Sequence, residues 1–171
     1  MQILTTERLA LRTIEEADAP FYLNLVNTPD FITHIGDRGI RTLDAAREAI
    51  ANGPVAMQAA LGHSIYLVAL KGSGVAIGMC GLIKRDTLDD VDLGYAYLPP
   101  YFGQGYAYEA AQAVLGHARL AMGMTRLVAI VSPDNLASSG LLEKLGMRYE
   151  QLLYLKPDDP TRLYRIDLCA T

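Results

Sequence analysis

Two residue types are scarce in this sequence of 171 residues, which has two cysteines and no tryptophan. Cys80 and Cys169 lie far apart, and neither belongs to a Cys-x-x-Cys or Cys/His cluster. A disulfide framework or a structural metal site therefore has little support, and we interpret both residues as ordinary buried thiols. We expect no metal in the functional site.

Basic residues and long apolar runs are also few. Lys and Arg number 15 against 19 Asp and Glu, a formal net charge of -4. This balance argues against nucleic-acid and anionic-membrane partners, because their binding surfaces need clustered positive charge. Residues 1–12 alternate polar and apolar side chains and carry no basic leader. We therefore expect no signal peptide, no membrane span and a cytoplasmic protein.

The sequence does contain enough apolar material for one buried core. Hydrophobic residues make up 51% and charged residues 20% of the chain, which is the composition of a globular protein. At this length a second core would be too small. We predict one domain that covers residues 1–171.

Hydrophobic periodicity predicts a mixed α/β chain. Alternating or continuous apolar runs predict strands at residues 8–13, 64–70, 75–84, 91–97, 127–131, 147–155 and 162–169. Apolar residues at helical spacing predict helices at about residues 19–26, 42–61, 107–118 and 135–145, the second of them interrupted or kinked at Gly53 and Pro54. Residues 27–41 are interpreted as a loop. Strand 91–97, helix 107–118 and strand 127–131 predict a right-handed parallel crossover.

The most informative segment joins strand 91–97 to the long helix through a turn that contains Gly103 and Gly105. The first N–H groups of a helix have no internal partner and carry the positive end of its dipole, and glycine lets a bulky anion approach the backbone. A phosphate or diphosphate would fit this turn. A P-loop is excluded because Gly-Lys-Ser/Thr is missing, and a dinucleotide fingerprint because Tyr108 stands where Gly or Ala is needed. A turn that merely connects strand to helix stays open.

Taken with its surroundings, this turn resembles motif A of the GNAT acetyltransferase superfamily, whose pattern is Gln/Arg-x-x-Gly-x-Gly/Ala after a strand. Asn135-Leu136-Ala137-Ser138, with Gly146 closing the following helix, resembles motif B. The opening Thr6-Glu7-Arg8-Leu9-Ala10-Leu11-Arg12 resembles the branch that contains the ribosomal-protein N-terminal (alanine/serine) acetyltransferases. The resemblance spans nearly the whole chain and implies a GNAT fold. That fold has a central, mostly antiparallel, twisted sheet of about six or seven strands with one parallel, splayed pair, flanked by about four helices.

The resemblance implies an enzyme that transfers the acetyl group of acetyl-CoA to a primary amine by direct attack. The acceptor would be a protein N-terminus or a small molecule, and the protein a monomer or a homodimer. The residues implied to bind acetyl-CoA are Tyr97, Leu98, Gly103, Gln104, Gly105, Tyr106, Ala107, Asn135 and Ser138. Free backbone near Tyr97 and Leu98 would pair with the pantetheine arm and supply an oxyanion donor, whereas Asn135 either contacts that arm or only caps its helix.

Two residues are catalytic candidates by resemblance. Asp92 stands where this family often has Glu, on the strand face opposite Tyr95, and would accept the amine proton directly or through water. The alternative for Asp92 is a solvated acid beside Asp89 and Asp90. Ser138 would protonate the departing thiolate, or is simply the third residue of a helix.

The sequence departs from the family pattern in two places. Pro100 replaces the leading Gln or Arg of motif A, and Leu142 stands where many members have a Tyr that serves as the general acid. These departures keep open a second hypothesis, a non-catalytic acetyl-CoA-binding sensor or docking module. His34 lies in the predicted loop that borders the acceptor cleft in this family, and is a substrate contact or an ordinary exposed histidine.

Overall fold

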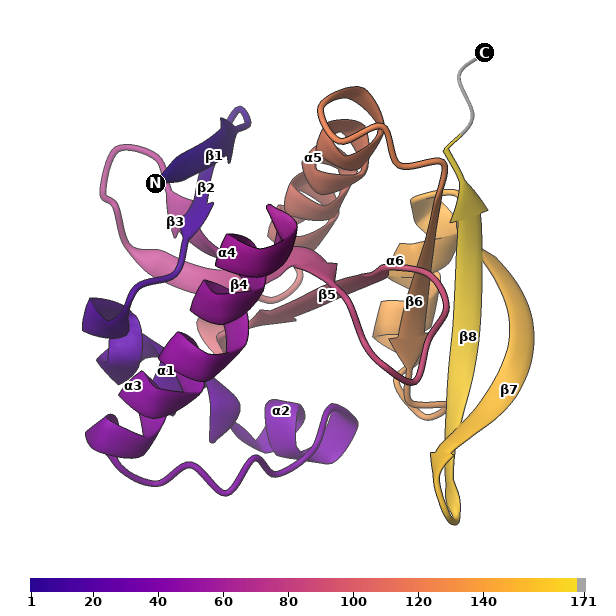
Figure 1. Ribbon diagram of the computed structural model, residues 1–171, viewed down its shortest axis with the longest axis horizontal. Helices are drawn as coiled ribbons and strands as arrows, with labels where there is room; N and C mark the ends of the chain where they lie inside the picture. The colour runs from indigo at the N-terminus through magenta and orange to yellow at the C-terminus, as the bar shows by residue number, and fades with distance from the viewer. Residues whose placement is uncertain (169–171) are drawn as a thin grey trace.

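The structure, a computed structural model, describes residues 1–168, so Cys169 lies outside the described residues. Its centre is an eight-stranded sheet with the order β1-β2-β3-β4-β5-β6-β8-β7 (Figure 1). The strands are β1 (Gln2–Thr5), β2 (Leu9–Thr13), β3 (Ile65–Leu70), β4 (Ala76–Ile83), β5 (Asp92–Tyr97), β6 (Arg126–Val131), β7 (Arg148–Lys156) and β8 (Asp159–Asp167). Every neighbouring pair is antiparallel except β5 and β6, which confirms the predicted mixed fold with one parallel pair.

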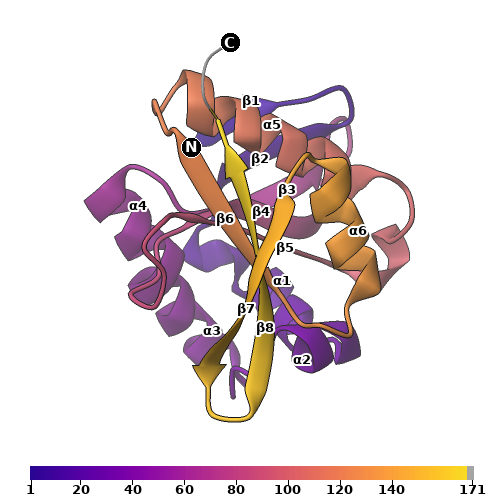
Figure 2. The same ribbon diagram turned by 90° about the vertical axis from the view of Figure 1, so that its right-hand side faces the viewer.

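Helices cover both faces of the sheet (Figures 1 and 2). They are α1 (Ala19–Val26), α2 (Pro29–His34), α3 (Leu43–Ile50), α4 (Ala56–Leu61), α5 (Tyr106–Leu120) and α6 (Leu136–Lys144). Buried residues of α1 and α3 pack against one face of the sheet, and those of α5 and α6 pack against the other. Among residues 1–168, no helix has the length and apolar character needed to cross a bilayer.

The parallel pair separates almost as soon as it forms. The only register pair between β5 and β6 joins Asp92 to Val128, and Val128 N–H donates to Val91 O at 3.0 Å. In Figure 1, β5 and β6 then run in clearly different directions, and β8 and β7 continue the sheet beyond β6. The splay implied by the family resemblance is therefore present.

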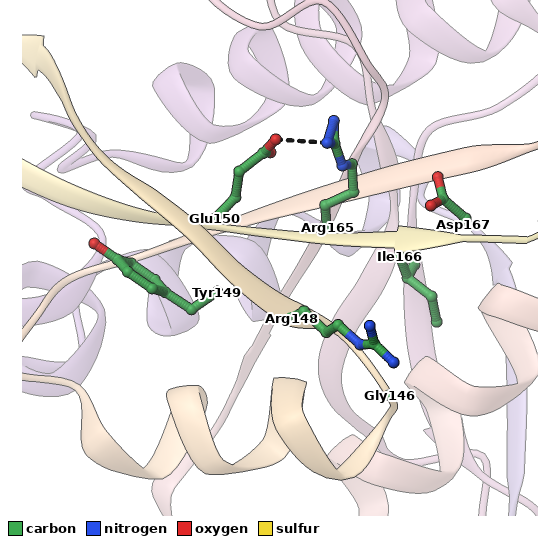
Figure 3. Close-up of a pocket in the computed structure, with 7 residues that line it drawn as sticks. All are labelled: Gly146, Arg148, Tyr149, Glu150, Arg165, Ile166 and Asp167. Carbon is green, nitrogen blue, oxygen red and sulfur yellow. Dashed lines mark ion pairs between the residues drawn. The ribbon is translucent and has the colours of Figure 1, made fainter.

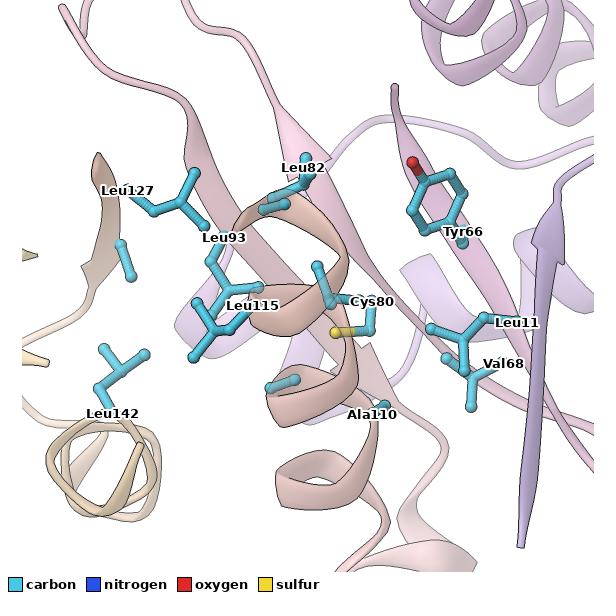
Figure 4. Close-up of a cluster of buried hydrophobic side chains, with 14 of the residues drawn as sticks. Leu11, Tyr66, Val68, Cys80, Leu82, Leu93, Ala110, Leu115, Leu127 and Leu142 are labelled. Atoms are coloured by element: carbon cyan, nitrogen blue, oxygen red, sulfur yellow. The ribbon is translucent and has the colours of Figure 1, made fainter. Parts of the chain in front are cut away.

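The core lies between the sheet and α5. Figure 4 shows Cys80 and Leu93 of the sheet close to Ala110 and Leu115 of the helix. The apolar stripe predicted for this helix is buried as expected, with Ala110, Ala111, Val114, Leu115 and Ala118 inside. Removing one of the larger side chains from water contributes roughly 1.5–3 kcal/mol, so this stripe fixes α5 firmly on the sheet.

Two elements were not predicted from the sequence. The strand β1 is missing from the prediction because it has only four residues, two of them apolar, which is too short to show a period. Its register with β2 shifts between Gln2 and Leu4. The predicted loop 27–41 is wrong for Pro29–His34, which forms α2. Its start signal was present, since Thr28 Oγ1 accepts from Phe31 N–H at 3.4 Å and a proline follows the cap.

The predicted interruption at Gly53 and Pro54 takes a specific form. Residues Ala51–Val55 make a π-helical turn between α3 and α4, and the chain stays helical through the proline. The wider turn accommodates a residue that removes one N–H from the hydrogen-bond ladder. The helix then ends at Leu61, as predicted, before Gly62 at φ 75°.

Cys80 should be chemically inert in the native protein. It is fully buried, and burial raises the pKa of its thiol to about 12. Because the thiolate is the reactive form, we predict that a Cys169→Ser variant shows no rapid reaction with DTNB near pH 8 while folded, and one reactive thiol after unfolding in guanidinium. Rapid labelling of the native variant would contradict the burial of Cys80.

Candidate active site

The turn between β5 and α5 has a backbone that requires its glycines. Gly103 and Gly105 have φ values of 70° and 83°, in the left-handed region that favours glycine. The first main-chain hydrogen bond of the helix runs from Glu109 N–H to Gly105 O at 3.0 Å. The N–H groups of Tyr106 and Ala107 precede it and have no partner within the helix, so they form a cluster of donors at its positive end.

The side chain of Gln104 does not extend this cluster. Its Nε2 donates to Pro100 O at 2.9 Å, which folds the side chain back across the turn. Position 100 therefore lacks the Gln or Arg side chain of the family pattern, but the carbonyl of Pro100 helps to close the loop. What the turn offers an anion is main-chain N–H groups.

The backbone of β5 is free on one side only. Free backbone is expected near Tyr97 and Leu98, but Leu98 N–H donates to Ile77 O of the neighbouring β4 at 2.9 Å, so this amide is already paired. In an antiparallel ladder alternate residues direct both N–H and C=O to the same neighbour. The main-chain groups of Tyr95 and Tyr97 must therefore face the opposite side, toward β6, beyond the single Asp92–Val128 pair.

A hydroxyl pair joins β5 to α6. Tyr95 Oη lies 2.5 Å from Ser138 Oγ, and either atom could be the donor. Ser138 N–H donates to Asn135 Oδ1 at 3.1 Å, so Asn135 caps the helix as predicted and Ser138 is its third residue. Burial raises the pKa of Tyr95, which keeps its phenol protonated at neutral pH.

Asp92 is neither solvated nor isolated. Its side chain is 2% exposed, and Oδ2 accepts from Arg85 Nε at 2.7 Å. Oδ1 is buried and has no hydrogen-bond partner among residues 1–168. Burial raises the pKa of Asp92, although the Arg85 guanidinium and the nearby backbone N–H of Ile130 oppose this effect. A buried carboxylate with one unpaired oxygen, beside the point where two strands separate, is a candidate proton acceptor.

The predicted catalytic residues stand on two faces of the sheet. Tyr95 contacts Ser138 on the face covered by α5 and α6, whereas Asp92 points the other way because neighbouring residues of a strand alternate. Arg85, which holds Asp92, was not predicted, because nothing in a loop sequence shows which carboxylate an arginine will reach. His34 lies in the last turn of α2 and not in a loop, and its Nδ1 is buried without a hydrogen-bond partner among the described residues.

A separate surface hollow lies away from these residues. It is lined by residues at the end of α6 and on β7 and β8, where Figure 3 shows Glu150 and Arg165 joined as an ion pair of 2.6 Å. None of the predicted site residues lines it. In the part of the chain that the structure describes, no group of three or more His, Cys, Asp or Glu side chains is arranged to hold a metal ion.

Comparison with known proteins settles the family. Residues 8–148, most of the chain, match the family described as acetyltransferase (GNAT) domain. The chain belongs to the GNAT acetyltransferase family. This confirms the resemblance carried by the turn after β5 and by the start of α6, and with it the N-acetyltransferase class. GNAT enzymes take their acetyl group from acetyl-CoA and transfer it to amines.

Individual relatives agree with this assignment. YnaD of Bacillus subtilis, an uncharacterized N-acetyltransferase, is 29% identical over 147 residues that cover 86% of this chain and 83% of YnaD. The crystal structure of an acetyltransferase from Agrobacterium tumefaciens has a TM-score of 0.81 at 28% identity and covers 97% of this chain and 94% of that chain. RimL, an alpha-N-protein acetyltransferase of a ribosomal protein, solved in complex with coenzyme A, has a TM-score of 0.83 at 19% identity and covers 98% of both chains. At that identity the likeness to RimL shows the fold alone.

The importance of Gly105 can be tested against a matched glycine. Gly123 follows the other end of α5 with a similar φ of 65° and open space where a Cβ would lie, whereas a Cβ at Gly105 would lie 3.3 Å from Arg8 Nη2. Both Val substitutions should lower the free energy of unfolding, because a left-handed backbone costs an L-residue roughly 1–2 kcal/mol. Only Gly105→Val should also weaken coenzyme A binding, about tenfold or more by calorimetry.

Asp92→Asn serves as a second comparison in that experiment, because it leaves the turn intact. We expect Gly105→Val to weaken coenzyme A binding far more than Asp92→Asn does. Equal affinities of the two variants would contradict a role for this turn in holding the cofactor.

Proposed function

We propose that this GNAT enzyme acetylates a primary amine and that the diphosphate of acetyl-CoA binds the turn from Gly103 to Ala107. The observation that carries the proposal is two sets of main-chain groups without internal partners, one at the start of α5 and one on the β6 side of β5. The donors of α5 suit a diphosphate. The groups of β5 near Tyr95 and Tyr97 suit the amides of the pantetheine arm, because exposed backbone polar groups need partners when a ligand covers them.

Asp92 is the general base in this proposal, and it acts through water. Oδ1 is shielded from solvent and Oδ2 is held by Arg85, so the carboxylate does not reach an acceptor amine directly. Of the two routes that the sequence left open, burial favours the relayed one. The raised pKa of Asp92 makes its carboxylate a stronger base than that of an ordinary exposed aspartate, so it accepts a proton more effectively near neutral pH.

Ser138 is proposed to protonate the departing thiolate. As the nitrogen–carbon bond forms and the carbon–sulfur bond breaks, the Ser138 hydroxyl gives its hydrogen to sulfur. Tyr95 is in hydrogen-bond contact and remains protonated, so its hydroxyl can donate to Ser138 Oγ. Leu142, which stands where many family members have a Tyr acid, is buried and has no proton to donate. The Tyr95–Ser138 pair takes over that function in this proposal.

The acceptor is proposed to be an α-amino group. A peptide N-terminus has a pKa of about 7.7–8.0, against about 10.4 for lysine, so a useful fraction is neutral at physiological pH. A single buried carboxylate, that of Asp92, gives only modest help in removing the amine proton, and this is enough for an α-amino group, which is less basic than lysine. RimL, whose fold this chain shares, is named as an alpha-N-protein acetyltransferase, and this supports the same acceptor class.

A second candidate function is acetyl-CoA binding without catalysis. The observation that favours it is Leu142, buried to 1% exposure at the place where many family members carry the catalytic Tyr. The two functions differ in whether free thiol appears from acetyl-CoA when N-terminal peptides, polyamines, aminoglycosides or amino acids are added. Tight binding of acetyl-CoA without acceptor-dependent thiol release would contradict the enzymatic proposal.

The role of Asp92 can be tested against Asp89, a nearby exposed carboxylate. Asp92→Asn should lower kcat by about a hundredfold or more, the usual effect of losing a general base, while the Kd for coenzyme A stays unchanged. Asp89→Asn should leave both unchanged. Thermal unfolding of each variant checks that Arg85, left without its partner in Asp92→Asn, has not disrupted the fold.

The pH dependence of the acetyltransferase activity tests the role of Asp92 as a base. A base works only when it is deprotonated, so activity should be lost as the pH falls through the raised pKa of Asp92, at a higher pH than for an ordinary aspartate. This dependence should disappear in the Asn variant. An unchanged acidic limb in Asp92→Asn would assign the titration to another group.

A further inference from the structure

A hydrogen-bonded cluster of Thr6, Arg8 and Glu109 links the N-terminal segment to α5. The Glu109 carboxylate accepts three hydrogen bonds: from Thr6 Oγ1 at 2.5 Å, from Arg8 N–H at 2.8 Å and from Arg8 Nε at 2.6 Å. Thr6 and Arg8 belong to the opening segment before β2, and Glu109 to the first turns of α5, about a hundred residues later in the chain. The proposed acetylation mechanism gives these residues no role.

The guanidinium of Arg8 also reaches the glycine turn. Nη1 donates to Gln104 O at 2.9 Å, the guanidinium carbon lies 4.4 Å from the centre of the Tyr106 ring, and Nη2 borders the space beside Gly105. Glu109 holds Nε from the other side. The fixed fork of an arginine is suited to joining a carboxylate and a carbonyl in this way. The guanidinium is therefore oriented by the protein, between α5 and the turn that precedes it.

The bond to Gln104 sets the direction of a peptide group. Because a trans peptide is planar, its C=O and N–H point in opposite directions. With Gln104 O turned toward Arg8, the N–H of Gly105 must point away from Arg8. Gln104 lies between two glycines with left-handed φ, the residue type with the widest choice of conformations. Arg8 thus restrains a peptide that its own residues leave free to rotate.

Glu109 is otherwise badly placed for an anion site. A carboxylate in the first turns of α5 should repel a diphosphate at the same helix end. Its three hydrogen bonds direct it toward Thr6 and Arg8, and the Arg8 guanidinium neutralises its charge. A negative residue at this place makes sense if it holds Arg8 on the turn.

We propose that Arg8 and Glu109 form a clamp that fixes the turn from Gly103 to Ala107 in its anion-binding conformation, so that both are positioning residues for coenzyme A. The proposal rests on the proposed function of that turn. The clamp lowers the entropic cost of binding by holding the donors in place before the ligand arrives. It also gives a function to the opening Thr-Glu-Arg-Leu segment.

The test measures the Kd for coenzyme A by calorimetry in Arg8→Ala, Arg8→Lys, Glu109→Gln and a control. The control is Arg126→Ala, which removes an exposed ion pair to Asp167 of 3.0 Å elsewhere in the sheet. Arg8→Ala should raise the Kd about tenfold, and Arg126→Ala should leave it within about twofold. Arg8→Lys should behave like Arg8→Ala, because lysine keeps the charge but lacks the fork.

Glu109→Gln gives the sharpest result, because the two explanations predict opposite signs. If charge near the phosphates were all that mattered, removing this negative charge would tighten binding. The clamp predicts weaker binding, and predicts that the Arg8→Ala, Glu109→Gln double variant loses no more than either single variant, since both act through one contact. In activity assays of the Arg8→Ala and Glu109→Gln variants, KM for acetyl-CoA should rise, while kcat and KM for the amine should stay unchanged.

Hydrogen exchange of the turn separates a local role from general destabilisation. Amides of the peptide that contains residues 98–108 should exchange faster in Arg8→Ala, while those of β3 and β4 keep their protection. Binding by Arg8→Lys at the wild-type level, or tighter binding by Glu109→Gln, would overturn the clamp. Failure of the wild-type protein to bind coenzyme A would instead overturn the proposed function, so the two failures are distinguishable.

Discussion

The separation of β5 from β6 after a single pair is the constraint on which the site depends. Two strands that stayed paired along their length would use every main-chain donor and acceptor between them. Here Asp92 and Val128 are the only register partners, and the main-chain groups of Tyr95 and Tyr97 face the opening. Asp92, with its buried and unpaired Oδ1, lies beside this opening on one face of the sheet, and the Tyr95–Ser138 pair lies on the other face.

The strands can diverge because other contacts hold the two parts of the sheet together. The helix α5 begins beside the end of β5 and packs its apolar stripe across the sheet, and α6 buries Leu142 against the same core. Leu88, on the loop from β4 to β5, is buried with Val128 of β6 and Leu163 of β8. These apolar contacts supply the stability that the missing hydrogen bonds of a continuous parallel pair would have contributed.

Buried charge and hydroxyl groups at the opening are costly in stability unless they are paired. Asp92 has one such partner in Arg85, and its second oxygen has none among the described residues. Removing a carboxylate from water without full compensation costs free energy, which the raised pKa reflects. This retained cost supports the proposed role of Asp92 in accepting the proton of the amine.

Much of this arrangement follows from the sequence, and the reasons differ from element to element. The stripe from Ala110 to Ala118 and the glycines at 103 and 105 are local patterns, so the helix and the turn before it were predicted correctly. The capping of α6 by Asn135 was predicted on the same grounds. The hairpin of β3 and β4 followed from two apolar runs around a glycine-containing turn.

What the sequence did not reveal depends on contacts between distant segments. The burial of Asp92 depends on where the loop that carries Arg85 folds, and the hydrogen bond that occupies Leu98 N–H depends on the register of β4. The ion pair between Arg8 and Glu109 joins the opening segment to α5, which follows about a hundred residues later. The missed helix α2 is a different case. Its start signal, Thr28 followed by a proline, is present in the sequence, but a helix of six residues is too short to show a hydrophobic period.

An amide NMR titration with coenzyme A tests the central claim most directly. Resonances of the N–H groups of Gly103, Gly105, Tyr106 and Ala107, together with that of Tyr97, should shift with one common affinity, while Leu98, already bonded to Ile77 O, should change less. Shifts confined to other surfaces, such as the hollow lined by residues of β7 and β8, with the turn and β5 unaffected, would contradict binding in the opening between β5 and β6.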